Sequence, residues 1–414
     1  MAHLILPAVP SLEQTARRMQ EAAKYDVADD EPTAGEFADL WAVRARPAPP
    51  KVPKVFLSND CIFNCSYCGC RTGRDCPRYT STPRELARIA VKQAEAAPHR
   101  GVFISSGIYR SADYTEELIV ETLRIMRREL HFRGFIHAKI MPGADSGLIE
   151  QAGWLADRLS VNIELPSSEG YAVIAKQKNK ANILGPMGAI SRCIQGHAGE
   201  IDRLGRRFAR GGQTTQLIVG AMKETDRTAL VLAEALYRKY RLRRVYYSPF
   251  GRPSEEFAFF PEGSTPKWRT RRLYQADRLM QLYGFTADEL LPEEEPDILP
   301  DMDPKAAWAL RHLDRFPVEV NTADYETLLR VPGIGITCAQ RIVRARRVHV
   351  LTHDLLRKLG VSLKRTRFFI TCNGRYTGGS MLDSPGLRAV VRDGMGQLSL
   401  FDGEGASPLC TQGA

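Results

Sequence analysis

Residues 54–71 read KVFLSNDCIFNCSYCGCR, a short apolar run followed at once by a cysteine-rich loop. The apolar run predicts a buried β-strand, and Cys61, Cys65 and Cys68 follow it in the spacing C-x3-C-x2-C. The loop after a parallel strand lies at the carboxyl edge of the sheet, where barrel enzymes carry their chemistry. Three thiolates on one short loop can bind three irons of a 4Fe-4S cluster and leave the fourth iron open to a small chelating ligand.

The nine cysteines do not form a disulfide framework in a chain of 414 residues, and five of them lie within 61–76. A structural zinc site or a cluster held only by protein ligands is the alternative, with Cys70 or Cys76 as the fourth ligand. These two cysteines are also candidates for redox-active catalytic groups beside the substrate, or for small buried residues. The other four stand alone and are expected only to pack or to be exposed: Cys193, Cys338, Cys372 and Cys410.

Five more apolar runs follow the first, and each is separated from the next by a longer amphipathic stretch. The runs are GVFIS, FIHAKI, LSVNIEL, QLIVG and RVYYS, and helical spacing is clear over 83–97, 115–130, 189–209 and 227–240. Six strands with crossover helices predict an α/β fold with a parallel sheet, either open and doubly wound or curled into a partial (β/α)6 barrel.

The cysteine loop resembles the radical S-adenosylmethionine (SAM) superfamily, whose motif is C-x3-C-x-aromatic-C and whose aromatic position is Tyr67 here. The resemblance implies a partial (β/α)6 barrel and a 4Fe-4S cluster whose open iron binds the amino and carboxylate groups of SAM. It also implies that a flavodoxin- or ferredoxin-type reductant reduces the cluster, and that cleavage of SAM yields a 5′-deoxyadenosyl radical that abstracts a hydrogen atom. Tyr67 would stack near the adenine.

The same resemblance assigns SAM contacts to further segments. Ser105, Ser106 and Gly107 stand where the family usually has a Gly-Gly-Glu-like turn; the glutamate is missing, so carbonyls or hydroxyls would meet the SAM amino group. Glu164 stands where a fourth-strand polar residue meets the ribose or carboxylate, although a solvated carboxylate at a strand end is the alternative. The segment that packs on adenine corresponds to Val219 and Gly220.

The net charge of +10 is concentrated near the carboxyl end, because 305–375 holds fourteen Lys and Arg against five Asp and Glu. Within it, VEVNTADYETLLRVPGIGITCAQRIVRARR (318–347) predicts two helices joined by a tight turn, the first capped by Asn321 or Thr322. This stretch resembles a helix-hairpin-helix DNA-binding motif, which implies phosphate contacts without base recognition. A purely structural hairpin with a solvated charged face is the alternative. The expected DNA-binding residues are Gly333, Gly335, Arg341, Arg344, Arg346, Arg347, Lys364, Arg365 and Arg367.

Near the end of the chain, QLSLF (397–401) resembles the bacterial sliding-clamp-binding peptide. Gln397, Leu398, Leu400 and Phe401 would then bind the clamp, whereas the alternative is a segment that folds back on the body.

Five segments are predicted along the chain. They are a helical extension (1–50), a radical SAM barrel (51–284), an acidic linker (285–303), an all-α helix-hairpin-helix module (304–375) and a flexible tail (376–414). No apolar stretch long enough to span a membrane and no signal peptide is seen, so a cytoplasmic location is expected.

Together these features resemble the DNA modification or repair branch of the radical SAM proteins. The predicted function is therefore radical-based modification or repair of DNA. Two alternatives are radical SAM modification of RNA or of a nucleoside, and a DNA-binding adaptor with a structural iron-sulfur cluster.

Overall fold

The computed structural model describes residues 52–97, 100–251, 260–379 and 386–396. The chain divides into two compact units, 1–271 and 272–414. The predicted extension 1–50 and the clamp-like peptide 397–401 lie outside the described residues. None of the helices in the described part of the chain combines the length and apolarity that a bilayer crossing requires.

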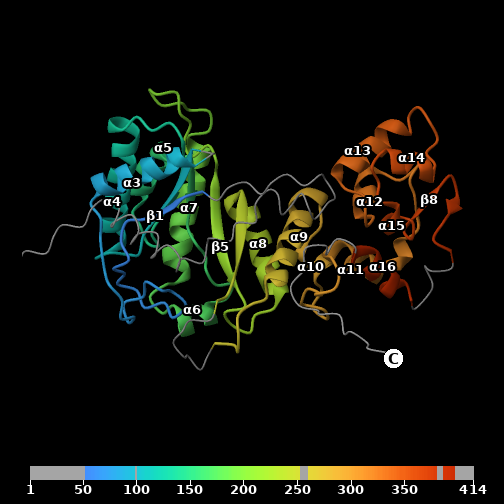
Figure 1. Cartoon of the computed structure of the whole chain (residues 1–414), viewed down its shortest axis with the longest axis horizontal. Coiled ribbons are helices and arrows are strands. Elements are labelled where there is room, and N and C mark those ends of the chain that lie inside the picture. The colour runs from blue at the N-terminus through green and yellow to red at the C-terminus, as the bar shows by residue number, and fades with distance from the viewer. Residues whose placement is uncertain (1–51, 98–99, 252–259, 380–385, 397–414) are drawn as a thin grey trace, which may run out of the picture. The chain divides into compact units, whose positions relative to one another are not determined.

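The first unit is built on a six-stranded parallel sheet (Figure 1), and all six predicted strands are confirmed. The strands are β1 (Lys54–Phe56), β2 (Gly101–Ser105), β3 (Phe135–Lys139), β4 (Arg158–Ser160), β5 (Gln213–Val219) and β6 (Arg244–Pro249). Their order in the sheet is their order in the sequence. Right-handed crossovers between successive neighbours place every connecting helix on one face of a sheet. The sequential order therefore favours the partial (β/α)6 barrel over a doubly wound sheet, whose order reverses at a switch point.

Helices follow most of the strands, as the amphipathic spacing predicts. They are α3 (Pro83–Ala96), α4 (Ala112–Arg124) with its π-helical extension η2 (Ile125–Glu129), α5 (Ser146–Leu155), α6 (Ser168–Ile174), α7 (Lys180–Gly196) and α8 (Asp226–Tyr240). One prediction is wrong in position: the helix expected over 189–209 begins at Lys180. Its start is fixed by a reciprocal hydrogen-bonded cap between Asn179 and Asn182, and Pro186 is accommodated inside it.

The two faces of the sheet differ in chemistry. Val55, Ile104, Ala138 and Leu159 lie at paired positions on neighbouring strands and are fully buried. Residues one position along each strand point to the opposite face. That face carries polar and charged side chains, among them Lys54, His137, Lys139, Arg158 and Ser160.

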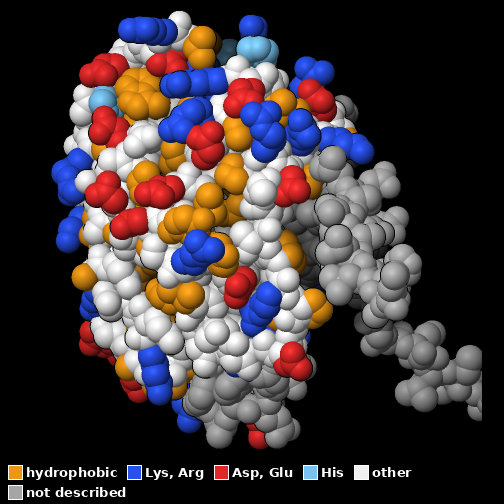
Figure 2. Space-filling view, turned by 90° about the vertical axis from the view of Figure 1, so that its left-hand side faces the viewer, with side chains coloured by type: hydrophobic (Ala, Val, Ile, Leu, Met, Phe, Trp, Pro, Cys, Tyr) orange, Lys and Arg blue, Asp and Glu red, His pale blue; other side chains and the backbone are white. Residues whose placement is uncertain are grey.

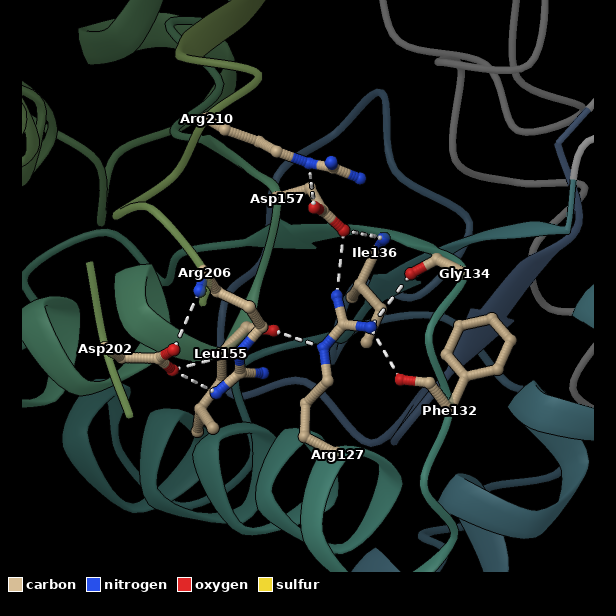
Figure 3. Close-up of polar contacts among 9 residues, drawn as sticks. All are labelled: Arg127, Phe132, Gly134, Ile136, Leu155, Asp157, Asp202, Arg206 and Arg210. Atoms are coloured by element: carbon tan, nitrogen blue, oxygen red, sulfur yellow. Dashed lines mark hydrogen bonds and ion pairs between the residues drawn. The ribbon is translucent and has the colours of Figure 1, made fainter. Parts of the chain in front are cut away.

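A buried ion pair fixes the amino-terminal ends of β3 and β4 (Figure 3). Arg127 of η2 donates to the Asp157 carboxylate at 2.8 Å and to the carbonyls of Leu155, Phe132 and Gly134 at 2.7–2.9 Å. The same carboxylate accepts hydrogen bonds from the Ile136 amide (2.8 Å) and from Arg210 (2.6 Å). Arg127 therefore joins a helix to two strands and satisfies carbonyls that would otherwise be buried without partners.

The surface of the first unit does not share the strong positive charge of 305–375. Figure 2 shows one face of this unit, on which Lys and Arg side chains are interspersed with Asp and Glu. Such a mixed surface creates no field of a single sign. The positive charge that favours a polyanion is thus a feature of the second unit.

Helix α9 (Lys267–Tyr283) contains the boundary between the units. The second unit continues with α10 (Ala287–Leu290), α11 (Pro304–Arg311), η3 (Leu313–Arg315), β7 (Val318–Glu319), α12 (Tyr325–Arg330), α13 (Ile336–Ala345), α14 (His353–Lys358), α15 (Leu363–Thr366), β8 (Ile370–Cys372), β9 (Arg375–Tyr376) and α16 (Leu387–Gly396). Its core includes Trp308, which makes edge contacts with Phe285 and Phe316 and stacks on His312.

Three features of this unit differ from the prediction. The module is not all-α, because β7, β8 and β9 form a small sheet. The segment 285–303 contains α10 and buries Phe285, Leu290 and Leu291, so its acidic residues stand on the surface of a folded segment. Helix α16 lies within the segment expected to be a flexible tail.

Replacing Arg127 with Met is expected to lower the free energy of unfolding by about 3–5 kcal/mol, because Asp157 would lose its buried partner. The control is Arg84→Met, which removes an exposed pair with Glu129 and should cost about 1 kcal/mol or less. Chemical denaturation of the two variants and the wild type measures both effects. Equal losses in the two variants would contradict the role given to Arg127.

Candidate active site

The three motif cysteines line one cavity at the carboxyl ends of the strands. Its empty volume, counted with the solvent at its mouth, is about 730 Å³. Of the predicted site residues, it brings together Cys61, Cys65, Tyr67, Cys68, Cys70, Ser106, Gly107 and Glu164. Residues from the ends of β1, β3, β4 and β5 complete the wall, among them Phe56, Lys139, Asn162 and Gln216.

The cysteine loop is held in place by its own side chains and by the next strand. Arg78 donates four hydrogen bonds of 2.6–2.8 Å to loop carbonyls, those of Asn59, Cys70, Arg71 and Arg74. Gly107 packs against the loop so closely that an added Cβ would lie 2.9 Å from the Cβ of Cys61. A glycine is therefore required at 107, which is a reason for this residue that needs no contact with a cofactor.

The sulfur atoms have the surroundings expected of cluster ligands. Cys61 Sγ accepts hydrogen bonds from the amides of Phe63 (3.4 Å) and Ile108 (3.3 Å), and Cys68 Sγ accepts one from Cys70 (3.4 Å). Burial raises the pKa of Cys65 to about 11 and also raises the pKa of Cys61. Because amide donors stabilise thiolates and the cavity excludes water, the donor set fits a 4Fe-4S cluster.

No three His, Cys, Asp or Glu side chains among the described residues converge on a point that could hold a single metal ion. A cubane cluster does not require such convergence, since each cysteine binds a different iron. The three thiols are nevertheless close enough to raise one another's pKa. Their arrangement around a shared cavity is the one that a cluster demands.

A buried ion pair stands beside the cysteines. Lys178 Nζ lies 3.2 Å from Glu164 Oε1 and 3.0 Å from the Tyr67 hydroxyl, with 11% and 6% of the Lys178 and Glu164 side chains exposed. Burial lowers the pKa of Lys178, but the charge of Glu164 outweighs it and raises the pKa overall. Lys178 therefore stays protonated and gives the cavity a fixed positive charge. The alternative of a solvated Glu164 is wrong.

Four predicted residues do not line the cavity. Ser105 is buried on β2, and Cys76 is half-buried outside the lining. Val219 and Gly220 lie beyond the cavity wall, and Gly220 faces Thr265, whose Oγ1 would be 2.2 Å from an added Cβ. Of the two extra cysteines, only Cys70 reaches the cavity.

Several residues of the site are not among those predicted from the sequence. Lys178, Lys139, Asn162 and Gln216 are polar residues that the fold brings together from three strands and from the segment between α6 and α7. The available signal was position, since Lys139, Asn162 and Gln216 stand at or near the ends of predicted strands. Lys178 carried no such signal.

Glu116 of α4 is fully buried behind the cavity wall. One carboxylate oxygen accepts a hydrogen bond from the amide of Met141 (2.9 Å), a lining residue, and the other has no partner among the described residues. Burial raises the pKa of Glu116 to about 8. The folded protein therefore holds a proton on this carboxyl group at neutral pH.

In the second unit, α12 and α13 form the predicted hairpin. Gly335 caps α13 as expected, while Asp324 caps α12 in place of Asn321 or Thr322. Gly333 has a φ of +87°, which only glycine adopts without strain, and an added Cβ would lie 2.4 Å from Thr366 Oγ1. Gly333 and Gly335 are thus explained by the turn itself.

Two buried side chains support this turn. Lys305 Nζ donates to the Ile334 carbonyl at 2.6 Å, and burial lowers the pKa of Lys305 to about 7. The Tyr283 hydroxyl accepts a hydrogen bond from the Ile336 backbone and so serves in place of an N-cap side chain, which Gly335 lacks. The hairpin is therefore a packed, rigid element.

The predicted basic residues differ in their surroundings. Arg346 is turned inward, and its guanidinium donates to the carbonyls of Val320 and Ala323. Arg341 is exposed but donates to the Leu359 carbonyl at 3.0 Å. Arg365 is half-buried. The remaining basic residues of the predicted surface are Arg344, Arg347, Lys364 and Arg367.

Comparisons with known proteins agree with the hairpin. Residues 315–357 match the family model of the helix-hairpin-helix motif. No curated protein matches the chain. Among solved structures, one of HydG, a maturase of the FeFe-hydrogenase, is 16% identical with a TM-score of 0.42 and covers 55% of this chain and 49% of its own. The HydG structure from Carboxydothermus hydrogenoformans has the same identity and TM-score and covers 84% and 81%. Similarity this low says nothing about what the present chain acts on.

We expect Glu116 to make the stability of the first unit depend on pH. Its pKa is raised in the folded state, so the folded protein binds more protons than the unfolded chain between about pH 4.5 and 8. Stability should fall as pH rises through that window, by on the order of a few kcal/mol. Glu116→Gln should remove this part of the decline, whereas Glu117→Gln, at the exposed neighbour, should not. Denaturation curves at several pH values test this; identical slopes for wild type and Glu116→Gln would contradict it.

Proposed function

We propose that this chain is an iron-sulfur enzyme of the radical SAM type that modifies or repairs DNA. The observation that carries the proposal is the meeting of Cys61, Cys65 and Cys68 in one cavity at the carboxyl ends of a singly wound parallel sheet. The match of 315–357 to the helix-hairpin-helix motif supports DNA as the target. Each half of the proposal has its own support and its own test.

The cluster and SAM, when bound, would supply the one-electron chemistry that generates a 5′-deoxyadenosyl radical. Cys61, Cys65 and Cys68 would each hold one iron. Lys178 offers a fixed positive charge to a carboxylate, and the Glu164 carboxylate is held beside it. Tyr67 is fixed by its hydrogen bond to Lys178, so its ring is already oriented.

The remaining wall residues orient a ligand or exclude water. Asn162 and Gln216 are buried and bonded to each other at 3.3 Å, which fixes their amide groups on the cavity wall. Phe56, Phe63 and Met141 give the wall an apolar part. A dry cavity protects a reactive radical from solvent. Cys70 is the remaining thiol of the cavity wall that could return a hydrogen atom to a substrate.

The hairpin and its basic side chains would bind the DNA backbone. Arg344 and Arg347 lie on and just after α13, while Lys364 and Arg367 come from α15 and the residue that follows it. Phosphate contacts of this kind position a duplex but do not read its sequence. A base or sugar inside a duplex cannot reach a barrel mouth, so the target nucleotide would be flipped out, single-stranded or damaged.

Two partners belong to the proposal without further support from the described residues. A flavodoxin- or ferredoxin-type donor would reduce the cluster, and a sliding clamp would bind 397–401. RNA or nucleoside modification predicts that structured RNA or nucleosides, and not DNA, stimulate SAM cleavage. The adaptor alternative predicts a cluster without SAM cleavage.

The cluster half is tested by Cys61→Ala, Cys65→Ala and Cys68→Ala after anaerobic reconstitution. Each is expected to lose most of the bound iron and all reductive cleavage of SAM, since each removes one of three ligands. Cys193→Ala, which alters a half-buried thiol on α7, is the control and should keep both. Iron analysis and chromatography of 5′-deoxyadenosine give the readouts. Full iron content with no SAM cleavage in the wild type would favour the adaptor.

The DNA half is tested by removing two basic charges in the full chain. Arg344→Gln with Arg347→Gln should weaken binding to duplex DNA and reduce the slope of log affinity against log salt by about 1 for each phosphate that is no longer neutralised. Lys92→Gln, at a charged residue on α3, is the control and should keep the wild-type slope. An unchanged slope in the double variant would remove the hairpin from the DNA-binding surface.

A further inference from the structure

Four neighbouring strands each contribute one polar side chain to a single row across the sheet. Lys139 of β3 pairs with Ser160 of β4, Ser160 pairs with Thr214 of β5, and Thr214 pairs with Arg244 of β6. Paired residues of parallel strands point to the same face of the sheet. Lys139 lines the cysteine cavity, so the whole row faces the interior of the partial barrel.

The two hydroxyl groups in the middle of the row are buried without a partner. Ser160 is 3% exposed and Thr214 is 0% exposed. Neither Ser160 Oγ nor Thr214 Oγ1 makes a hydrogen bond to any described residue. Buried hydroxyls in native proteins are satisfied almost without exception. Two such groups side by side, about 4.8 Å apart across neighbouring strands, indicate a shared ligand.

The charges around the hydroxyls are positive. Lys139 and Arg244 stand at the two ends of the row, and Lys54, His137 and Arg158 lie on the same face at the next paired positions toward the strand starts. Burial lowers the pKa of His137, and the charges of Arg158, Lys54 and Lys139 lower it further. Glu164, the carboxylate that lines the cavity, is already bound by Lys178.

We infer that this row, Lys139, Ser160, Thr214 and Arg244, binds a phosphate group of the substrate nucleotide. Hydroxyl donors flanked by cations are suited to an oxyanion, which can accept from both hydroxyls at once. The phosphate belongs either to a free nucleotide or to a nucleotide unit of a polynucleotide. Because the row lies within the strands and the cysteine loop lies at their ends, the sugar and base extend toward the loop. The inference deepens the proposed function and rests on it for the identity of the nucleotide.

The first experiment measures binding by calorimetry to the full chain without iron. The probes are inorganic phosphate, 2′-deoxyadenosine 5′-monophosphate and 2′-deoxyadenosine. We expect the two phosphate-bearing probes to bind and the nucleoside not to. Ser160→Ala with Thr214→Val should weaken the binding of the monophosphate by about tenfold to a hundredfold, since two hydrogen bonds to a charged group are removed.

The matched control is Thr122→Val, at a buried threonine whose hydroxyl bonds the Leu118 carbonyl within α4. It should bind the monophosphate as the wild type does. Lys139→Gln keeps both hydroxyls and should also weaken binding, which guards against misfolding of the double variant. Wild-type affinity in both row variants, or equal affinity for nucleoside and nucleotide, would overturn the inference and leave the hydroxyls to water.

A second experiment distinguishes the two sources of the phosphate and separates this inference from the proposed function. A single-stranded deoxyoligonucleotide and the monophosphate are compared as stimulants of SAM cleavage by reconstituted wild type and row variants. Stimulation by the oligonucleotide alone that disappears in the row variants assigns the row to a polynucleotide, and stimulation by the monophosphate assigns it to a free nucleotide. Stimulation that survives in the row variants contradicts the inference, while iron binding and basal SAM cleavage test the proposed function separately.

Discussion

The sequential order of the parallel strands is the constraint on which the site depends. Because each crossover returns to the adjacent position with the same hand, the connecting helices cover one face of the sheet and leave the other face to the barrel interior. A doubly wound sheet would bury both faces under helices, and its strands would be apolar on both sides. Here the interior positions are free to carry Lys139, Asn162 and Gln216.

The two ends of the strands have separate tasks. At the amino-terminal ends, Arg127 and Asp157 form a network of hydrogen bonds that joins η2, β3 and β4 (Figure 3). At the carboxyl ends, the cysteine loop and the Lys178–Glu164 pair stand around an open cavity. Stability placed at one end allows the other end to hold buried charge and thiols that contribute little to folding.

Local patterns in the sequence predicted most of the fold and the cysteine part of the site. The six strands are short apolar runs, and the motif cysteines lie within eight residues of one another, so neither depended on long-range information. Lys178 could not be predicted, because it meets Tyr67 across 111 residues through a helix-to-helix connection. Arg346 was misread for the same reason: a helical surface shows a charge but not the carbonyls of Val320 and Ala323 to which it turns. Composition also misled at 285–303, where acidic residues mask the apolar positions that α10 buries.

Glu164 links the backbone of the sheet to the charge in the cavity. Its φ of +61° is a left-handed conformation that a residue with a side chain adopts only under constraint. The constraint is visible, since the Glu164 amide bonds the Gln216 carbonyl at 2.9 Å and its carbonyl accepts from Ile218 at 2.7 Å. These two bonds extend the pairing of β4 with β5 beyond the end of β4. Strained backbone of this kind persists where the surrounding structure holds it and is concentrated at functional sites. An ordinary extended residue at 164 would point its carboxylate elsewhere and leave Lys178 buried without its partner. The strain at 164 and the ion pair at 178 therefore support each other, and both place charge beside the thiols that the sequence motif put there.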